Sequence, residues 1–271
     1  MCELLGLCFS QPVSPSISFR GFRHRGENNP HGWGIAFYPD RSAQVIKEPV
    51  RAGESKLSQF LQEYDQLQSQ IFIAHVRYMS RGEKSHANTH PFIRELGGKE
   101  YVFAHNGTID HRSLRLGRFQ PVGNTDSEHL FCHLLARFEE QGISKWDEAS
   151  FQWLTEVLHE TNNKGKMNLL FSEGKFLFCY RCQFGHTSLQ FVRREAPFPR
   201  IRLQDEDWEI NLEEEKSPDQ AGYVVATRKL TNERWKNFEK GELCVFLDGE
   251  IVFSSSGREE GEKGEIDEII D

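Results

Sequence analysis

The sequence predicts an α+β fold in which antiparallel sheets stack against each other within one domain. Strand-like segments open the chain, helical patterns occupy its middle, and strand-like segments return from Met167 onward. This order favours stacked sheets over alternating βαβ units, which would place a helix between successive strands. A hydrophobic fraction of 37%, with 21 Phe among 271 residues, can fill a sizeable core. We expect one domain over residues 1–257 and an acidic tail over 258–271, which lacks aromatic residues.

Short apolar runs in the first part of the chain predict five strands. They are bounded by glycine, proline or polar residues and span residues 2–9, 32–38, 44–51, 71–77 and 101–105. The Asn106-Gly107 pair after the last run is typical of a turn, because glycine tolerates φ > 0. Residues 16–25 are expected to form a short helix. Apolar residues at helical spacing, Phe60 among them, predict a second helix with one buried face over Leu57–Leu67.

Two further helices and six strands are predicted in the rest of the chain. Apolar positions 130, 131, 134, 135 and 138 give residues 127–141 one hydrophobic side, and Phe151–His159 suggests another helix. Asp126 would stand near the N-terminus of the first of these helices, where a carboxylate is favoured. The strands are expected at residues 167–172, 176–182, 188–193, 223–227, 243–247 and 251–253. Asp248-Gly249 predicts a type I′ hairpin between the last two strands.

Composition and charge argue against several classes of protein. The net charge of −8 is unlike that of proteins that bind the phosphate backbone of nucleic acids, which need a basic face. No apolar run approaches the ~18–20 residues that span a bilayer, and no secretory signal is recognisable. The six cysteines do not form a pattern typical of a disulfide framework. We therefore expect a cytoplasmic protein without nucleic-acid or membrane partners.

Two residue spacings could indicate a metal site, and both are interpreted otherwise. His86 and His90 are four residues apart, but Pro91 prevents a helix from continuing through this pair. Cys179 and Cys182 have C-x-x-C spacing within a strand-like run and lack a second pair, so a structural role is favoured. We expect neither a metal nor another cofactor.

Cys2 is the candidate nucleophile. If Met1 is removed, one residue carries both a thiol and a free α-amine. An α-amine with an ordinary pKa of about 7.7–8.0 is partly neutral at physiological pH and can accept the thiol proton, so no separate histidine is needed. A cysteine on a first strand is, taken alone, more often a buried apolar residue. The motifs further along the chain favour the catalytic interpretation.

Four motifs and an N-x-H-P sequence follow one another in a specific order, with the N-x-H-P sequence between the second and the third motif. They are Cys2, His75-Val76-Arg77, Asn88-Thr89-His90-Pro91, His105-Asn106-Gly107 and Thr125-Asp126-Ser127-Glu128. Together they resemble the class-II glutamine amidotransferases of the N-terminal-nucleophile hydrolase superfamily, in particular the stand-alone members. The resemblance implies a four-layer αββα sandwich of two antiparallel sheets between helical layers, with the active site at one end of the sheets.

The resemblance also implies a reaction. Cys2 would attack the side-chain amide carbonyl of glutamine, release ammonia and carry the γ-glutamyl group as a thioester, which water then hydrolyses to glutamate. Its own α-amine would take the thiol proton and later donate to the departing ammonia. The side-chain amide of Asn106 and the backbone N–H of Gly107 would donate to the oxyanion of the tetrahedral intermediate.

Substrate binding is implied for three more residues. Arg77 would hold the α-carboxylate of the substrate, Asp126 would pair with its α-ammonium group, and the hydroxyl of Ser80 would also touch it. The better-known members of the family have Trp, Ala, Thr and His after the arginine, where this chain has Tyr78, Met79, Ser80 and Arg81. This departure leaves both glutamine and a larger γ-glutamyl compound open as the substrate.

Several outcomes for the same site stay open at this stage. The ammonia could pass to a partner protein, because we expect this domain to use the whole chain. The enzyme could instead hydrolyse another γ-glutamyl amide, or the site could belong to a non-catalytic glutamine sensor. A papain-like arrangement of Cys2, His90 and Asn106 is disfavoured, since a strand rather than a helix follows the cysteine.

Overall fold

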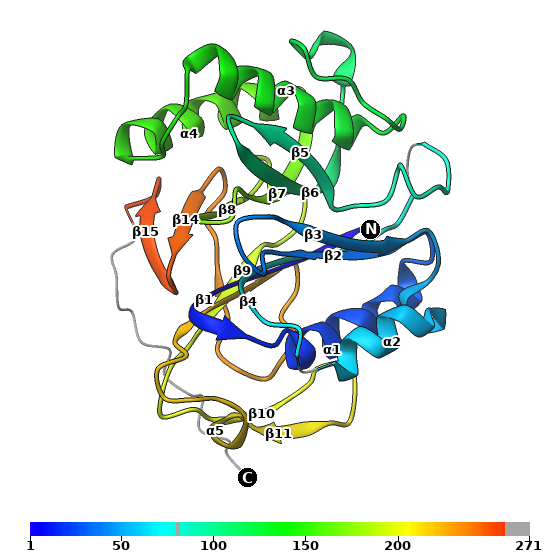
Figure 1. Ribbon diagram of the computed structural model, residues 1–271, viewed down its shortest axis with the longest axis vertical. Helices are drawn as coiled ribbons and strands as arrows, with labels where there is room; N and C mark the ends of the chain where they lie inside the picture. The colour runs from blue at the N-terminus through cyan, green and yellow to red at the C-terminus, as the bar shows by residue number, and fades with distance from the viewer. Residues whose placement is uncertain (65, 80–81, 258–271) are drawn as a thin grey trace.

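The computed structural model describes residues 1–64, 66–79 and 82–257. Two antiparallel sheets stack face to face between two layers of helices (Figure 1). Helices α1 (Ser16–His24) and α2 (Lys56–Glu63) cover one sheet, and α3 (Asp126–Gln141) and α4 (Glu148–Asn162) cover the other. The predicted α+β class and the αββα sandwich are therefore confirmed. The expected acidic tail at 258–271 lies outside the described residues.

The first sheet has seven strands, with β1 at its centre. Their order is β13 (Lys236–Asn237), β9 (Gln190–Arg194), β12 (Gly222–Ala226), β1 (Glu3–Val13), β4 (Ser69–Val76), β2 (Trp33–Phe37) and β3 (Gln44–Glu48). Glu3 lies opposite Val76 of β4, and Leu5 lies opposite Ala226 of β12. The beginning of β1 is therefore held by neighbouring strands on both of its edges.

The second sheet has six strands. Their order is β15 (Glu250–Ser254), β14 (Leu243–Leu247), β8 (Leu177–Tyr180), β7 (Gly165–Ser172), β6 (Lys99–Ile109) and β5 (Phe92–Leu96). Asp248 and Gly249 both have positive φ, 48° and 79°, which confirms the predicted type I′ turn between β14 and β15. Strand β5 was not predicted from the sequence, because charged residues interrupt its short apolar pattern. It forms because Gly97 and Gly98, both at positive φ, turn the chain back from β5 into β6.

Several shorter elements complete the fold. They are η1 (Arg25–Asn28), η2 (Ala52–Glu54), η3 (His111–Ser113), α5 (Leu212–Glu215), β10 (Arg200–Arg202) and β11 (Glu209–Asn211). Strands β10 and β11 pair with each other beside α5, at the end of the molecule opposite α3 and α4 (Figure 1). In the described part of the chain, no helix combines the length and the hydrophobicity that crossing a bilayer requires.

The alternation of side chains along β1 sorts them into two layers. Leu4 and Cys8 pack between the two sheets, whereas Leu5 packs in the layer that also contains side chains of α1 and α2. A third apolar cluster joins the second sheet to α3 and α4. By the same alternation, Cys2 belongs to the inner side of the first sheet and Glu3 to its outer side.

Asn106 and Gly107 lie inside β6 rather than in the turn that their sequence predicts. The strand continues to Ile109, and Gly107 lies opposite Met167 of β7. A Cβ atom at Gly107 would stand 1.9 Å from the carbonyl oxygen of Lys166, so close backbone approach requires glycine here. The prediction of a turn was wrong because uninterrupted pairing with β7 outweighs the local preference of Asn-Gly.

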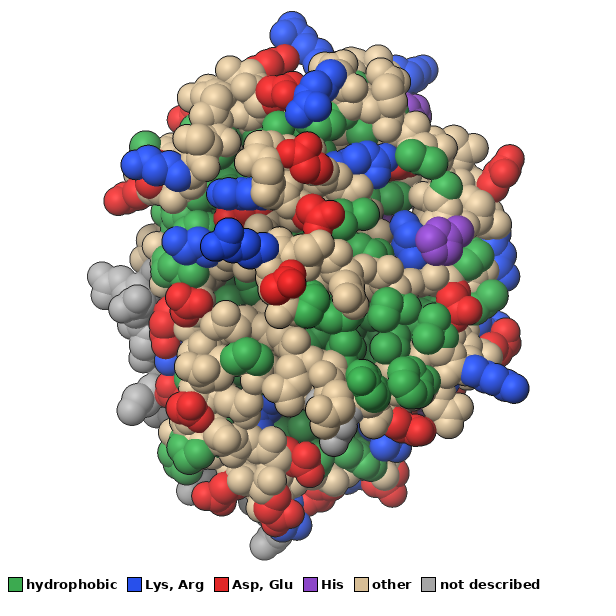
Figure 2. All heavy atoms as spheres, viewed as in Figure 1, with side chains coloured by type: hydrophobic (Ala, Val, Ile, Leu, Met, Phe, Trp, Pro, Cys, Tyr) green, Lys and Arg blue, Asp and Glu red, His purple; other side chains and the backbone are tan. Residues whose placement is uncertain are grey.

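Helix α2 is shorter than predicted and exposes part of its apolar surface. It ends at Glu63, and its buried side chains are Ser58 and Leu61. Phe60 therefore faces solvent, with 55% of its surface exposed, and its predicted place in a buried face was wrong. Figure 2 shows hydrophobic side chains gathered over this part of the molecule, where the exposed residues of and beside α2 are Leu57, Phe60 and Tyr64.

Candidate functional site

Cys2 lies just before the central strand β1. Its thiol donates a hydrogen bond to the backbone carbonyl of Tyr78 (3.3 Å), and its Sγ accepts one from the Tyr78 N–H (3.2 Å). Burial raises the pKa of Cys2, whereas the Tyr78 backbone, the amino terminus and Arg77 act in the opposite direction. The thiol is therefore protonated near neutral pH and needs a base before it can act as a nucleophile.

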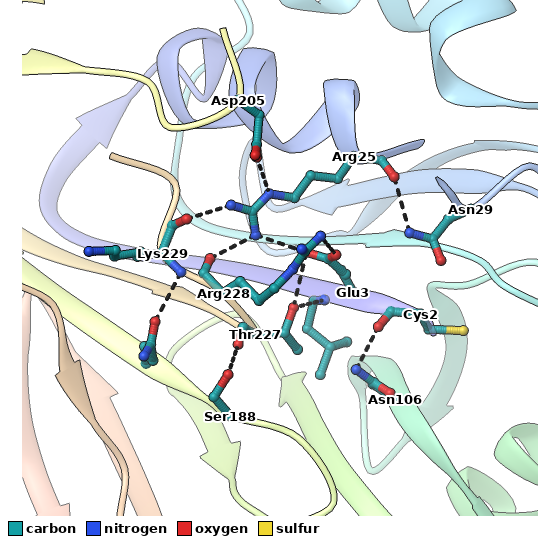
Figure 3. A network of polar contacts seen from close by, with 12 residues as sticks. Cys2, Glu3, Arg25, Asn29, Asn106, Ser188, Asp205, Thr227, Arg228 and Lys229 are labelled. Carbon is teal, nitrogen blue, oxygen red and sulfur yellow. Dashed lines mark hydrogen bonds and ion pairs between the residues drawn. The ribbon is translucent and has the colours of Figure 1, made fainter. Parts of the chain in front are cut away.

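Asn106 places its side-chain amide beside the nucleophile candidate. Its Nδ2 donates to the carbonyl oxygen of Cys2 at 2.6 Å, a contact drawn in Figure 3. An amide NH₂ carries two hydrogens, so this nitrogen can hold Cys2 and also donate to a second acceptor. The fold thus brings together two predicted site residues that are 104 positions apart in the chain.

The backbone of β6 directs the Gly107 N–H away from β7. The Asp110 N–H donates to the Lys164 carbonyl on the β7 side (2.9 Å), whereas the Ile109 N–H donates to Asp126 Oδ2 on the other side (2.8 Å). N–H groups alternate in direction along a strand, so that of Gly107 points the same way as that of Ile109. It therefore faces the side of β6 on which Asp126 lies.

Arg77 and Asp126 bring opposite charges into the site. Arg77 follows β4, is only 3% exposed, and donates from Nη1 to the Glu83 carbonyl at 2.9 Å. Asp126 is buried at the first residue of α3, which confirms its predicted place at a helix N-terminus. Burial lowers the pKa of Arg77, while Cys2 and Asp126 act to raise it. Arg77 is therefore close enough to both groups to influence them electrostatically.

Asn88, the first residue of the N-x-H-P motif, connects the segments that carry these charges. Its Nδ2 donates to the Glu83 carbonyl (3.1 Å) and to Asn124 Oδ1 (2.8 Å), and its Oδ1 accepts from the Asn124 N–H (2.9 Å). A Cβ atom at Gly123 would lie 2.1 Å from Asn88 Oδ1, so glycine permits this contact. The motif is visible in the sequence, but the role of Asn88 in fixing the two segments relative to each other was not predicted from it.

His31 holds the segment after Arg77 and was not singled out by the sequence analysis. The Met79 N–H donates to His31 Nδ1 at 3.0 Å, and the imidazole packs edge-on against Tyr78 with ring centroids 5.4 Å apart. A histidine within a loop of Gly, Asn and Pro has no local pattern that would have revealed this contact. Ser80, expected to touch the substrate, lies outside the described residues.

Three buried histidines come from the motifs of the site. The rings of His75 and His90 pack against each other at an angle of 35° with centroids 4.2 Å apart, and His105 Nδ1 lies 2.9 Å from Ser127 Oγ. Burial, followed by the charges of Arg77 and His105, lowers the pKa of His75 to about 3. Burial also lowers the pKa of His90 and of His105. All three imidazoles are therefore neutral at physiological pH.

We expect the folded state to lose stability as the pH falls below about 6.5, the ordinary pKa of histidine in an unfolded chain. Unfolding frees these histidines to bind protons, so their contribution is complete above that pH and is lost as the pH falls toward the lowered native pKa values. The expected slope is about 1.4 kcal/mol per pH unit for each histidine that stays neutral. Urea unfolding between about pH 7 and pH 5 measures it.

The variant His90→Phe isolates one of these contributions. Phenylalanine preserves the ring packing of His90 against His75 and Phe92. The unfolding free energy of the variant should therefore change with pH by the contribution of one histidine less than that of the wild type. His86→Ala is the matched control, because His86 is exposed and should leave the slope unchanged. Equal slopes for the wild type and His90→Phe would contradict the assignment.

The fold is that of the N-terminal-nucleophile hydrolases. A cysteine precedes the central strand of two stacked antiparallel sheets, and an amide donor from the second sheet contacts it. The family model for class-II glutamine amidotransferases matches residues 1–268, and the chain belongs to that family. The family predicted from the motifs is therefore confirmed.

Comparisons with individual proteins agree with this assignment. The chain is 46% identical to an uncharacterized protein of Methanocaldococcus jannaschii, over 94% of this chain and 72% of that protein. It is 38% identical to "Putative glutamine amidotransferase YafJ" of Escherichia coli, over 93% of this chain and all of that protein.

Solved structures show the same fold. A "predicted glutamine amidotransferase" from Pseudomonas aeruginosa has a TM-score of 0.70 at 30% identity, covering 93% of this chain and 100% of that one. The glutamine phosphoribosylpyrophosphate amidotransferase of B. subtilis has a TM-score of 0.61 at 18% identity. That likeness covers 94% of this chain but 49% of the larger enzyme, and it concerns the fold alone.

Proposed function

We propose that the protein hydrolyses the side-chain amide of glutamine, or of a related γ-glutamyl compound, through a thioester on Cys2. The observation that carries the proposal is the contact of Asn106 Nδ2 with the carbonyl oxygen of Cys2 at 2.6 Å. This contact supports the proposed role of the Asn106 amide as an oxyanion donor, because the amide lies beside the residue that carries the thiol. The buried charges of Arg77 and Asp126, which match the two charged ends of an amino acid, support the same proposal.

The proposed reaction begins with transfer of the thiol proton of Cys2 to its α-amine. The thiolate attacks the amide carbon, and the resulting oxyanion accepts hydrogen bonds from Asn106 Nδ2 and the Gly107 N–H. The C–N bond then breaks, and the ammonium group of Cys2 returns the proton to the departing ammonia. Water hydrolyses the thioester by the same route and releases the acid with a free thiol.

Removal of Met1 is part of this proposal. While Met1 is attached, the nitrogen of Cys2 is a peptide amide and cannot accept the thiol proton. Met1 is 66% exposed, so an aminopeptidase can reach the bond that it forms. Intact-mass measurement of protein from its native cell tests this step, and a chain that retains Met1 there would contradict the catalytic proposal.

The substrate is tested with a panel of γ-glutamyl amides, scored for release of ammonia or amine with glutamine as reference. Tyr78, whose backbone contacts the Cys2 sulfur, is 47% exposed. This exposure is compatible with a substituent on the γ-amide, so larger amides belong in the panel. Binding of glutamine without turnover of any member would instead favour the glutamine sensor. The ammonia acceptor we propose is a partner protein, which co-purification tests.

Asp126→Asn should reduce kcat/KM for glutamine by at least about 30-fold, because it leaves the substrate α-ammonium without its buried anionic partner. The asparagine side chain keeps an oxygen that can accept from the Ile109 N–H, so the fold should be preserved. Steady-state kinetics of ammonia release measures the effect.

A substrate analogue provides the matched control for Asp126→Asn. 4-Carbamoylbutanoate is glutamine without its α-amino group, so it has no cation for Asp126 to bind. The wild type and the variant should hydrolyse it at similar rates. An equal loss of activity on glutamine and on the analogue would show that Asp126 supports the fold and does not recognise the ammonium group.

A further inference from the structure

We propose that Glu3 is a positioning residue, whose buried carboxylate fixes the start of β1 and thereby the direction of the Cys2 thiol. The inference rests on the proposed function, in which Cys2 is the nucleophile. It adds a residue that the motifs of the family resemblance do not include. An ionisable side chain is out of place in the apolar run of residues 2–9, and Glu3 is only 5% exposed.

Two arginines neutralise the Glu3 carboxylate. Arg25 Nη1 donates to Glu3 Oε2 at 2.9 Å, and Arg228 Nη2 donates to Oε1. Thr227 Oγ1 approaches Oε2 at 3.5 Å and also accepts the N–H of Leu4 at 3.3 Å. A buried carboxylate is tolerated only with such partners, so the end of the strand has one favourable position.

Arg25 connects Glu3 to two other parts of the chain, through three acceptors. Its guanidinium is 4% exposed and donates to Asp205 Oδ2 (2.9 Å), to the Arg228 carbonyl (2.9 Å) and to the Lys229 carbonyl. Figure 3 shows the network around Glu3, with the sulfur of Cys2 directed away from it. The network therefore holds the strand from its outer side and leaves the thiol facing the inner side, where Asn106 lies.

The need for this anchor follows from the chemistry of the first residue. Once Met1 is removed, Cys2 is a chain terminus, and termini are poorly ordered unless they are tied down. Among the described contacts of Cys2, Asn106 holds its backbone carbonyl, whereas the Tyr78 backbone holds only its sulfur. Glu3, the next residue, is held from the outer side of the sheet. This matters because a displacement of about 1 Å at a reacting group can cost ~100-fold in rate.

The experiment compares Glu3→Gln with the wild type after Met1 removal. Glutamine keeps the shape of the side chain but loses the charge that binds Arg25 and Arg228. We expect kcat to fall by about 10- to 100-fold while KM changes little. The rate of Cys2 alkylation by iodoacetamide should also change, and this readout does not depend on glutamine hydrolysis.

Glu233→Gln is the matched control. Glu233 forms an equally buried ion pair with Arg194 (2.7 Å). Arg194 lies opposite Gly222, and Gly222 lies opposite Phe9, so this ion pair is far along β1 from Glu3. This variant should lose comparable stability without a change in kcat or in Cys2 alkylation. Equal kinetic losses in both variants would overturn the proposal, as would an unchanged kcat in Glu3→Gln.

A second variant keeps the proposal testable if Glu3→Gln does not fold. Arg228→Ala removes the more exposed of the two partners and leaves Arg25 to neutralise Glu3. It should alter Cys2 alkylation and lower kcat to a smaller extent than Glu3→Gln, and an unchanged alkylation rate in this variant would overturn the proposal. If the wild type hydrolyses no γ-glutamyl amide, the proposed function fails. An alkylation rate that still changes in Glu3→Gln and not in Glu233→Gln would then uphold the positioning role.

Discussion

Cys2→Ala should lower the rate of ammonia release by a factor on the order of 10⁴–10⁶, the range seen when the nucleophile of a covalent hydrolase is removed. The variant should still bind glutamine, because Arg77 and Asp126 carry the proposed binding charges and neither depends on the thiol. Single-turnover ammonia release and calorimetric binding, measured on the same preparation, separate the two effects. Retained binding with lost turnover would support catalysis over sensing.

Cys8→Ala is the control for the loss of a thiol on the same strand. Cys8 is buried in the layer between the sheets, and burial raises its pKa to about 12, so it is not a nucleophile. Its replacement should leave kcat unchanged, and a glutamine-mimicking electrophile should add mass at Cys2 and not at Cys8. Wild-type turnover in Cys2→Ala would contradict the mechanism.

The presence of Met1 supplies a second comparison for the same mechanism. Folded protein that retains Met1 has the Cys2 thiol but no free α-amine, and we expect it to be inactive. Preparations with different degrees of processing, quantified by intact mass, should have activities proportional to the processed fraction. Full activity in the unprocessed chain would show that another group accepts the proton.

Asn106→Ala should reduce kcat by about 10²–10³-fold with a small change in KM, because removing one oxyanion donor costs about 3–4 kcal/mol in comparable hydrolases. The donor acts on charge that develops in the transition state, so substrate binding depends on it much less. Steady-state kinetics on glutamine measures both constants. Asn162→Ala is the control: Asn162 is a fully buried asparagine at the end of α4 that contacts Gly165 and Tyr180. It should lower stability but not kcat.

Asn106 also holds the Cys2 carbonyl, and alkylation separates this role from that of oxyanion donor. Displacement of iodide by the thiol develops no oxyanion, so Asn106→Ala should slow alkylation of Cys2 far less than hydrolysis. A parallel decrease of both rates would indicate that Asn106 only positions the nucleophile. For Glu3→Gln we expect both hydrolysis and alkylation to change, because both rates depend on the position of Cys2.

Much of the fold follows from local pattern. The β2–β3 and β14–β15 hairpins could be predicted because each is specified by two apolar runs and the turn between them. The start of α3 could be predicted because the polar residues before its apolar stripe cap the helix, as Thr125 does by accepting the Glu128 N–H. The order of these elements was sufficient to indicate stacked sheets, and the motif residues were sufficient to indicate the family.

The errors occurred where contacts between distant segments override such patterns. Asn106-Gly107 would form a turn in isolation, but β7 pairs with it and extends the strand. Phe60 has the spacing of a buried residue, but helix α2 packs through Ser58 and Leu61. No window of sequence contains both partners in either case, so local pattern cannot predict which preference prevails.

The residue types of the candidate site could be predicted from the sequence, since the thiol, the amide and the two charged groups each occur in a motif. Their arrangement could not. Cys2 meets Tyr78 and Asn106, and Glu3 meets Arg25 and Arg228, only after four strands (β1, β4, β6 and β12) and their connecting segments have packed together. Residue type supplies the reactive groups locally, whereas the distances and burial that set their pKa values and their alignment are properties of the assembled core.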